Sequence, residues 1–291
     1  MLMNHNERRK RLRRVFNGSS CVSPASVYDP LSARLAQTVG FEIGIFSGSL
    51  ACATTLAAPD LNLVTLTEFA EQVRRIMRVS DLSLVVDADN GHGNALNTMR
   101  TIEELEFAGV SLISIEDLAL PMRFSQPEGA TELVSLEEMA GKIKAAVRAR
   151  QDDDLMIAGR TAALTCEGRP SAVARARAYA HAGADAIFLV GAKTLDDIEA
   201  VHRAAGLPVI VGLGPPALSR KDMAARGARM LTQGHQPLAA AVNALRETYE
   251  HFLGGGSPAE LEKKIASREQ MEQLVFCDEY RQRQRQYLHV E

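Results

Sequence analysis

Cysteine is scarce in this chain of 291 residues, and its four copies are scattered, with no Cys-x-x-Cys pair and no spacing typical of a zinc site. The sequence therefore offers neither a disulfide framework nor a thiolate metal site. We expect reduced thiols in a cytoplasmic protein. Cys21 and Cys52 are expected to pack as small apolar side chains.

An excess of one charge and long apolar runs are also lacking. The net charge is −3 with acids and bases interspersed, so no basic stripe for nucleic acid is present. No apolar run reaches the ~18 residues of a membrane span, and the start of the chain lacks the apolar core of a signal peptide. The one basic run, NERRKRLRRVF, is expected to form a solvated helix, with a contact between subunits as the alternative.

What the sequence does contain is a repeated alternation of short apolar runs and amphipathic segments. The apolar runs, which predict buried strands, are CVSPASVYD, FEIGIFSG, LSLVVDAD, VSLISIED, LMIAGRT, DAIFLVG, LPVIVGLG and ARMLTQG. Helical periodicity between and after them covers 30–39, 66–79, 95–108, 136–150, 171–182, 194–205, 218–226 and 237–253. Because parallel neighbours need crossovers, these units predict an α/β fold, a (β/α)₈ TIM barrel. A doubly wound sheet is the alternative, but SVYDPLS offers no glycine-rich phosphate turn.

A flexible break, GGGSP, follows Leu253. It divides the chain into a barrel domain, 1–254, and a C-terminal helical tail, 255–291. The tail is polar and predicts one or two helices outside the barrel. Such helices are poorly stable in isolation, so we expect the tail to pack on a neighbouring subunit or across the face of the barrel.

Acidic side chains gather where the predicted strands end. Asp87 and Asp89 end the third strand, Glu116 and Asp117 end the fourth, and Asp60 lies in the loop after the second. Barrel chemistry occurs at this C-terminal rim, and crowded carboxylates repel unless a cation neutralises them. Oxygen ligands favour Mg²⁺ or Mn²⁺. The alternative is that these acids cap helices, and for Asp117 we prefer that structural interpretation.

Arg160, at the end of LMIAGR, brings a cation to the same rim. An unpaired buried guanidinium is costly, so its partner is either a rim carboxylate or a carboxylate of the substrate. Gly48 and Ser49 follow the second strand, and His235 follows the eighth. His235 is either a structural hydrogen-bonding residue or a substrate contact, and both interpretations stay open. Together these residues predict a substrate with a carboxylate beside a metal-chelating oxygen.

The string DADNGHGN resembles the D-x-D-x-G-Y/H/F-G metal motif of the isocitrate lyase/phosphoenolpyruvate mutase superfamily. The surrounding context resembles it too, in SVYDPLSARLAQTVGFE, SGS, APD, SIED and IAGRT. The resemblance covers the barrel from Cys21 to about His251. Within the superfamily the chain is most similar to the oxaloacetate decarboxylase branch, through FSGSLACATTLAAPD, LTEF, DADNGHGNALNTMRTIEELE and TQGH.

This resemblance implies a Mg²⁺-dependent cytoplasmic carboxy-lyase that converts the α-keto acid oxaloacetate to pyruvate and CO₂ (bicarbonate). It also implies a homodimer or homotetramer in which paired subunits swap the last barrel helix. From the mixed charges and the short apolar runs, we expect no nucleic-acid or membrane partner. The implied roles are a direct metal ligand, Asp87; water-mediated metal contacts, Asp60, Asp89 and Glu116; substrate contacts, Ser49, Gly48, Arg160 and His235; and catalytic residues, Arg160 and His235.

The chain also departs from the superfamily's patterns. The lyases carry K-K-C-G-H after the fourth strand, where this chain has LALPMRFSQPEGATELVS, with neither cysteine nor lysine. TAAL follows Arg160 in place of T-[ND]-A, and the seventh strand ends VGLGPP where decarboxylases tend to offer an aromatic hydroxyl. Two alternatives remain, a related enzyme acting on a C–C or C–P bond of a 2-oxo or 2-hydroxy acid and a non-catalytic keto-acid-binding relative. The missing cysteine loop counts against the first.

Overall fold

The computed structural model describes residues 3–127, 131–215 and 217–288. Eight parallel strands lie side by side in chain order. They are β1 (Ala25–Ser26), β2 (Ile43–Ser47), β3 (Ser83–Asp87), β4 (Leu112–Glu116), β5 (Met156–Thr161), β6 (Ala186–Val190), β7 (Val209–Gly212) and β8 (Ala228–Leu231). A parallel bridge between Val22 and Met230 joins the segment before β1 to β8. The predicted (β/α)₈ barrel is therefore confirmed.

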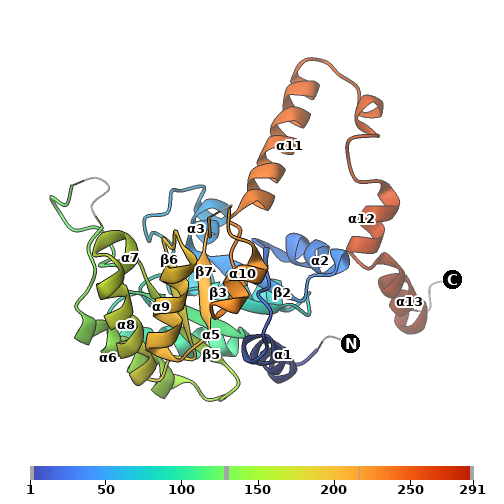
Figure 1. Cartoon of the computed structure of the whole chain (residues 1–291). Helices are drawn as coiled ribbons and strands as arrows, with labels where there is room; N and C mark the ends of the chain where they lie inside the picture. Colours follow the sequence, from blue (N-terminus) through green and yellow to red (C-terminus); the bar gives the residue numbers. More distant parts are fainter. Residues whose placement is uncertain (1–2, 128–130, 216, 289–291) are drawn as a thin grey trace.

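Helices cross between successive strands, as the periodicity predicted (Figure 1). They are α2 (Pro30–Val39), α4 (Leu66–Met77), α5 (Ala95–Phe107), α6 (Leu136–Ala149), α8 (Arg169–His181), α9 (Leu195–Ala205) and α10 (Arg220–Ala225), and the short α3 (Gly48–Ala51), η1 (Cys52–Leu56) and α7 (Ala163–Cys166) lie in loops. Local chemistry sets their ends. In α2, Asp29 and Ser32 form a capping box, Pro30 occupies the first turn, and Gly40 ends the helix at φ 109°.

Side chains of each strand alternate between two cores. Val85, Leu112 and Met156 belong to a cluster inside the barrel, whereas neighbours such as Leu84 and Ile113 pack outward under the helices. The inward-facing rows of β3, β4 and β5 therefore continue at their C-terminal ends into the charged residues of the rim. All four cysteines are free, and Cys21 and Cys52 are buried in the outer core as predicted.

The basic N-terminal run is not a solvated helix, and that expectation was wrong. It forms α1 (His5–Asn17), whose Leu12 and Phe16 belong to the cluster inside the barrel. Arg8 and Arg9 are only 1% and 5% exposed. Arg9 donates to the carbonyl oxygen of Val110 at 2.9 Å and pairs with Asp152 at 2.7 Å. The arginines can be buried because carbonyls and carboxylates at the N-terminal end of the barrel pair with the Nη atoms of Arg8 and with Arg9.

Phe16→Ala is expected to lower the free energy of unfolding by about 3–5 kcal/mol, because it leaves a cavity at the bottom of the barrel. Urea denaturation at fixed protein concentration measures the change. Lys10→Ala is the matched control on the exposed side of the same helix and should cost within about 0.5 kcal/mol. Equal stability of the two variants would contradict the conclusion that α1 fills the N-terminal end of the barrel.

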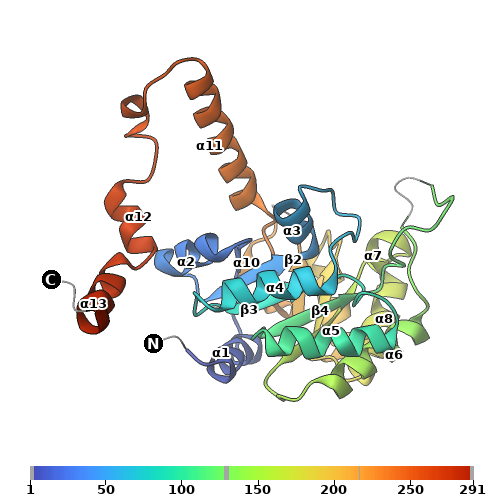
Figure 2. The same cartoon turned by 180° about the vertical axis from the view of Figure 1, so that it is seen from behind.

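The last barrel-derived helix, α11 (Gln236–Leu253), points away from the barrel, and none of its residues is buried (Figure 1). The chain then turns through η2 (Pro258–Leu261) into α12 (Arg268–Leu274) and α13 (Cys277–Leu288). Figure 2 shows α12 returning to lie beside α2. There Arg34 donates to the carbonyl oxygen of Leu274 at 3.3 Å and lies 4.1 Å from the centre of the Phe276 ring.

Over the described ranges, none of these helices combines the length and apolar character needed to cross a bilayer.

Candidate active site

The predicted rim residues meet in one cavity of about 480 Å³ at the C-terminal ends of the strands. Its lining includes every predicted site residue: Gly48, Ser49, Asp60, Asp87, Asp89, Glu116, Arg160 and His235. The convergence follows from the barrel, since parallel strands all deliver their last inward-facing residues to one end. Their individual roles in metal and substrate binding stay predictions.

The loop after β3 places Asp89 within a tight turn. Asp89 itself adopts φ 46°, and its carbonyl oxygen accepts a hydrogen bond from the N–H of Glu116 at 2.8 Å. A Cβ atom at Gly48 would lie only 2.4 Å from Asp89 Oδ1, so the close approach of these two loops requires glycine there. Asn62, which the sequence did not single out, donates to Asp89 Oδ2 at 2.9 Å.

Arg160 has two rim carboxylates as partners. Its Nη1 pairs with Asp87 Oδ2 and its Nη2 lies 3.2 Å from Glu116 Oε2. Burial disfavours the charged guanidinium, but the neighbouring carboxylates outweigh that cost and raise the pKa of Arg160. Its Nε is buried and has no hydrogen-bond partner among the residues that the structure describes. The cation is therefore permanently charged and keeps one unused donor.

The carboxylates of the cavity repel one another. Burial, with the charges of Asp87 and Asp60, raises the pKa of Asp89 to about 7, and burial likewise raises the pKa values of Asp60 and Glu116. Such a group of oxygen donors fits a hard divalent cation, which would relieve the repulsion. In the described part of the chain no three acidic, histidine or cysteine side chains converge closely enough to hold an ion directly. The arrangement thus fits an ion that fewer than three of these side chains contact directly.

His235 is held by hydroxyl groups on both sides of its ring. Nδ1 lies 3.0 Å from Ser26 Oγ, and Nε2 lies 3.1 Å from the Oγ atoms of Ser47 and Ser49. Burial lowers the pKa of His235, so the ring is neutral near pH 7. Ser26 was missed because it lies within the run CVSPASVYD, in which no charged residue directly follows the two-residue β1 to mark it as part of the rim. A neutral imidazole between hydroxyls is suited to exchanging a proton with Ser49, which lines the cavity.

Asp117 has the structural role that the sequence favoured, although it caps no helix. It is fully buried behind the cavity. Its carboxylate accepts hydrogen bonds from Tyr179 at 2.7 Å, from the N–H of Ala162 at 3.1 Å and from Arg175 at 3.3 Å. This network ties β4 to β5 and α8 and supports the strand that carries Glu116.

Comparison with known proteins gives a consistent set of similarities. The profile of the family described as phosphoenolpyruvate phosphomutase matches residues 12–253. An oxaloacetate decarboxylase of Rhodopseudomonas palustris (strain ATCC BAA-98 / CGA009) is 46% identical over 285 residues, 98% of each chain. The crystal structure of a phosphoenolpyruvate phosphomutase from Streptomyces platensis subsp. rosaceus superimposes with a TM-score of 0.87 at 30% identity, covering 96% of this chain and 99% of that one. A phosphonopyruvate hydrolase in complex with oxalate and Mg²⁺ gives 0.83 at 31% identity, with 98% and 100% covered.

Proposed function

The chain belongs to the phosphoenolpyruvate phosphomutase family, and we propose that it is a carboxy-lyase that decarboxylates oxaloacetate to pyruvate and CO₂. The observation that carries the proposal is the cavity, in which a permanently charged arginine and four acidic side chains face a space large enough for a small dicarboxylate. Among the described residues that line it there is neither cysteine nor lysine, so proton transfer by a cysteine, as in the lyases of the superfamily, has no basis here.

We propose that a divalent cation, Mg²⁺ with Mn²⁺ as an alternative, is held directly by Asp87 and through water by Asp60, Asp89 and Glu116. When bound, it supplies positive charge beside the carbonyl oxygen on which negative charge develops. The similarity to a protein that binds oxalate with Mg²⁺ supports this assignment.

The chain's own residues have separate tasks in the reaction. Arg160 binds a carboxylate of the substrate and adds positive potential near the developing enolate. Ser49 offers a hydroxyl to the same region, and His235 keeps that hydroxyl in place and can exchange its proton. The bond from C3 to the leaving carboxylate breaks, its electron pair remains as the enolate, and a proton added at C3 completes pyruvate. No base is needed to start the reaction.

A direct assay tests the proposal. Oxaloacetate with Mg²⁺ should release pyruvate well above the enzyme-free rate with the same metal, and EDTA should remove the excess. A panel of 2-oxo and 2-hydroxy acids, including a phosphonopyruvate, run beside it separates decarboxylation from C–C or C–P lyase activity. Metal-dependent turnover of another acid without release of pyruvate from oxaloacetate would overturn the assignment.

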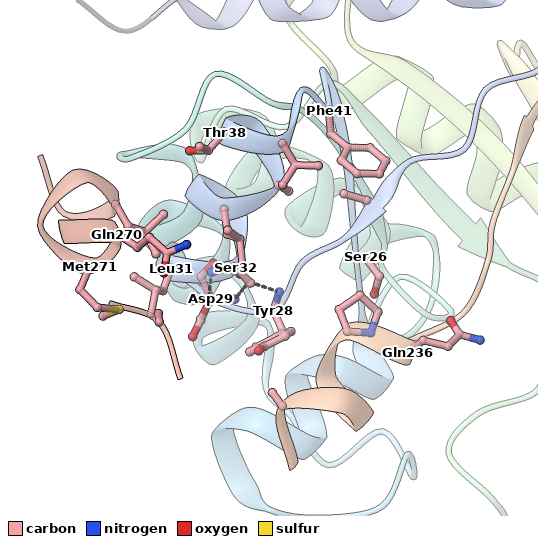
Figure 3. Close-up of a pocket in the computed structure, with 18 of the residues that line it drawn as sticks. Ser26, Tyr28, Asp29, Leu31, Ser32, Thr38, Phe41, Gln236, Gln270 and Met271 are labelled. Carbon is pink, nitrogen blue, oxygen red and sulfur yellow. Dashed lines mark hydrogen bonds between the residues drawn. The ribbon is translucent and has the colours of Figure 1, made fainter. Parts of the chain in front are cut away.

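We further propose that two copies of the chain exchange α11, forming a dimer as the minimum unit and a tetramer as a pair of dimers. One side of α11 carries exposed apolar residues: Val242, Leu245, Tyr249, Phe252 and Leu253. Such a helix needs an apolar partner. A groove of about 1430 Å³ between β1, α2, the start of α11 and α12 offers one (Figure 3). In this scheme residues 1–254 form the catalytic barrel and 255–291 a tail that closes the groove. The four free cysteines support a cytoplasmic location.

A chain ending at Gly254 is expected to associate more weakly than the full chain. The truncation removes Met271, Leu274 and Phe276, which line one side of the groove. Sedimentation velocity at several concentrations of each chain measures the association. Identical distributions for the two chains would contradict a role of the tail in assembly.

A further inference from the structure

A second cavity lies beside the active site, between the loop after β4 and helix α6. It measures about 590 Å³, and the loop after β3 contributes Asn90 to its lining. Leu120, in the loop after β4, borders both this cavity and the active-site cavity. Asn90 directly follows Asp89 in the sequence, and its Nδ2 donates to the carbonyl oxygen of Leu120 at 2.8 Å. The two cavities are therefore neighbours with a common wall.

Lys142, on α6, brings a buried cation to this second cavity. The residue lines the cavity and is only 1% exposed. Within the described part of the chain, its amine makes neither a hydrogen bond nor an ion pair. Burial lowers the pKa of Lys142, although the charges of Glu138, Glu116 and Asp117 act in the opposite direction. A buried ammonium without a partner is costly, so its presence beside a cavity points to an anion that neutralises it.

The carboxylates that act on Lys142 through space do not provide this partner. Glu116 is paired with Arg160, and Asp117 is held by the buried network behind the active site. Glu138 lies one turn before Lys142 on α6, but it is exposed to solvent and makes no ion pair with the amine. The amine is therefore available to a ligand in the cavity.

The rest of the lining suits a ligand with one negative charge and an apolar end. Arg123 and Glu132 pair with each other, and their side chains are 63% and 56% exposed, so they add no net charge. Beside Lys142 the wall is largely apolar: Ala119, Leu120, Pro121, Met122, Leu133 and Val134. A dicarboxylate would place its second charge against this wall without a partner, which is unfavourable.

We propose that this cavity is a binding site for a short monocarboxylate, with the carboxylate on the amine of Lys142 and the alkyl end against Leu120 and Val134. The site is distinct from the active site, whose described lining does not contain Lys142. It does not depend on the proposed decarboxylation. A ligand here contacts the same Leu120 that borders the active site.

Thermal unfolding of the full-length protein with butyrate as the probe tests the site. EDTA is included, because it removes any metal that would draw a carboxylate to the active site. Butyrate should raise the melting temperature in a saturable manner, since a ligand that binds only the folded state stabilises it. Formate, which lacks the alkyl chain, should need at least about tenfold more for the same shift. No saturable shift with butyrate, or an equal shift with n-butylammonium at the same ionic strength, would overturn the inference.

Variants locate the binding site. Lys142→Met removes the amine and should raise the butyrate concentration for half of the maximal shift at least about tenfold. Lys144→Met is the matched control, because Lys144 is exposed on the same helix, and that concentration should not change.

Glu138→Gln provides a second readout if Lys142→Met folds poorly. The substitution removes an exposed negative charge that acts on the amine, so the concentration of butyrate for half of the maximal shift should fall about two- to fivefold. An unchanged concentration in Lys142→Met, or in Glu138→Gln where Lys142→Met does not fold, would overturn the inference.

Discussion

Asp87→Asn is expected to reduce Mg²⁺ affinity more than ~100-fold and to remove decarboxylation with it. In the proposed site Asp87 is the direct ligand of the metal: it ends β3, lines the cavity and is 7% exposed. Its Oδ1 accepts a hydrogen bond from Ser114 at 2.9 Å, which fixes the plane of the carboxylate. Asparagine keeps the shape but gives up the negative charge, and a neutral amide is a poor ligand for a hard cation.

Asp89→Asn and Glu116→Gln are the comparison for this expectation. Residues that hold only metal-bound water typically change affinity or activity by ~10–100-fold. Calorimetric titration of Mg²⁺ into each variant gives the ranking independently of turnover. Normal Mg²⁺ affinity in Asp87→Asn would remove the metal from this position.

Arg160→Lys should lower kcat/KM for oxaloacetate by about 100–1000-fold, which corresponds to the loss of one preorganised donor to a developing charge. Lysine keeps the positive charge, so Asp87 and Glu116 retain a counter-ion and the melting temperature should stay close to that of the wild type. What lysine lacks is the planar fork with several donors, which pairs with both Asp87 and Glu116 and can bind a carboxylate at two points.

Arg175→Lys is the matched control for this substitution. Arg175 is also buried and ion-paired, with Asp117, but it lies behind the cavity and does not line it. There the change should lower the melting temperature more than kcat/KM, since breaking a buried polar network mainly destabilises the fold. Thermal unfolding and steady-state kinetics, measured on the same preparations, show whether each substitution affects mainly stability or mainly activity. An Arg160→Lys enzyme that melts early and turns over normally would make Arg160 a structural residue.

Much of the site was predictable because the barrel geometry is encoded locally. Three of the rim residues come at the end of an apolar run that predicts a buried strand: Asp87, Glu116 and Arg160. Each of them also continues the row of side chains that face the inside of the barrel. When eight such runs alternate with helices, the strands form a barrel, and their C-terminal ends all lie on the same face of it. The order of residues along the chain was therefore enough to bring these three together.

Other contacts depend on residues far apart in the chain. Whether Arg160 pairs with rim carboxylates or stays free for a ligand was open until the two Nη atoms could be placed beside Asp87 and Glu116. Ser26 reaches His235 across 209 positions, and Asn62 reaches Asp89 from a loop of irregular backbone. No periodicity marks such pairs, because hydrogen bonds between loops follow from how the strands stack.

By itself the sequence determined the pattern of strands and helices and the rim at which the charged residues gather. Only the tertiary structure decided that the basic helix α1 packs against the N-terminal end of the barrel. From hydropathy alone, α1 is expected to be a solvated helix. Its Arg8 and Arg9 are nevertheless buried, because they bond to carbonyl and carboxylate groups at the bottom of the barrel. These partners lie about 70 to 140 residues away along the chain. Burial of a charge depends on the partners that surround it, and those partners exist only once the barrel has closed.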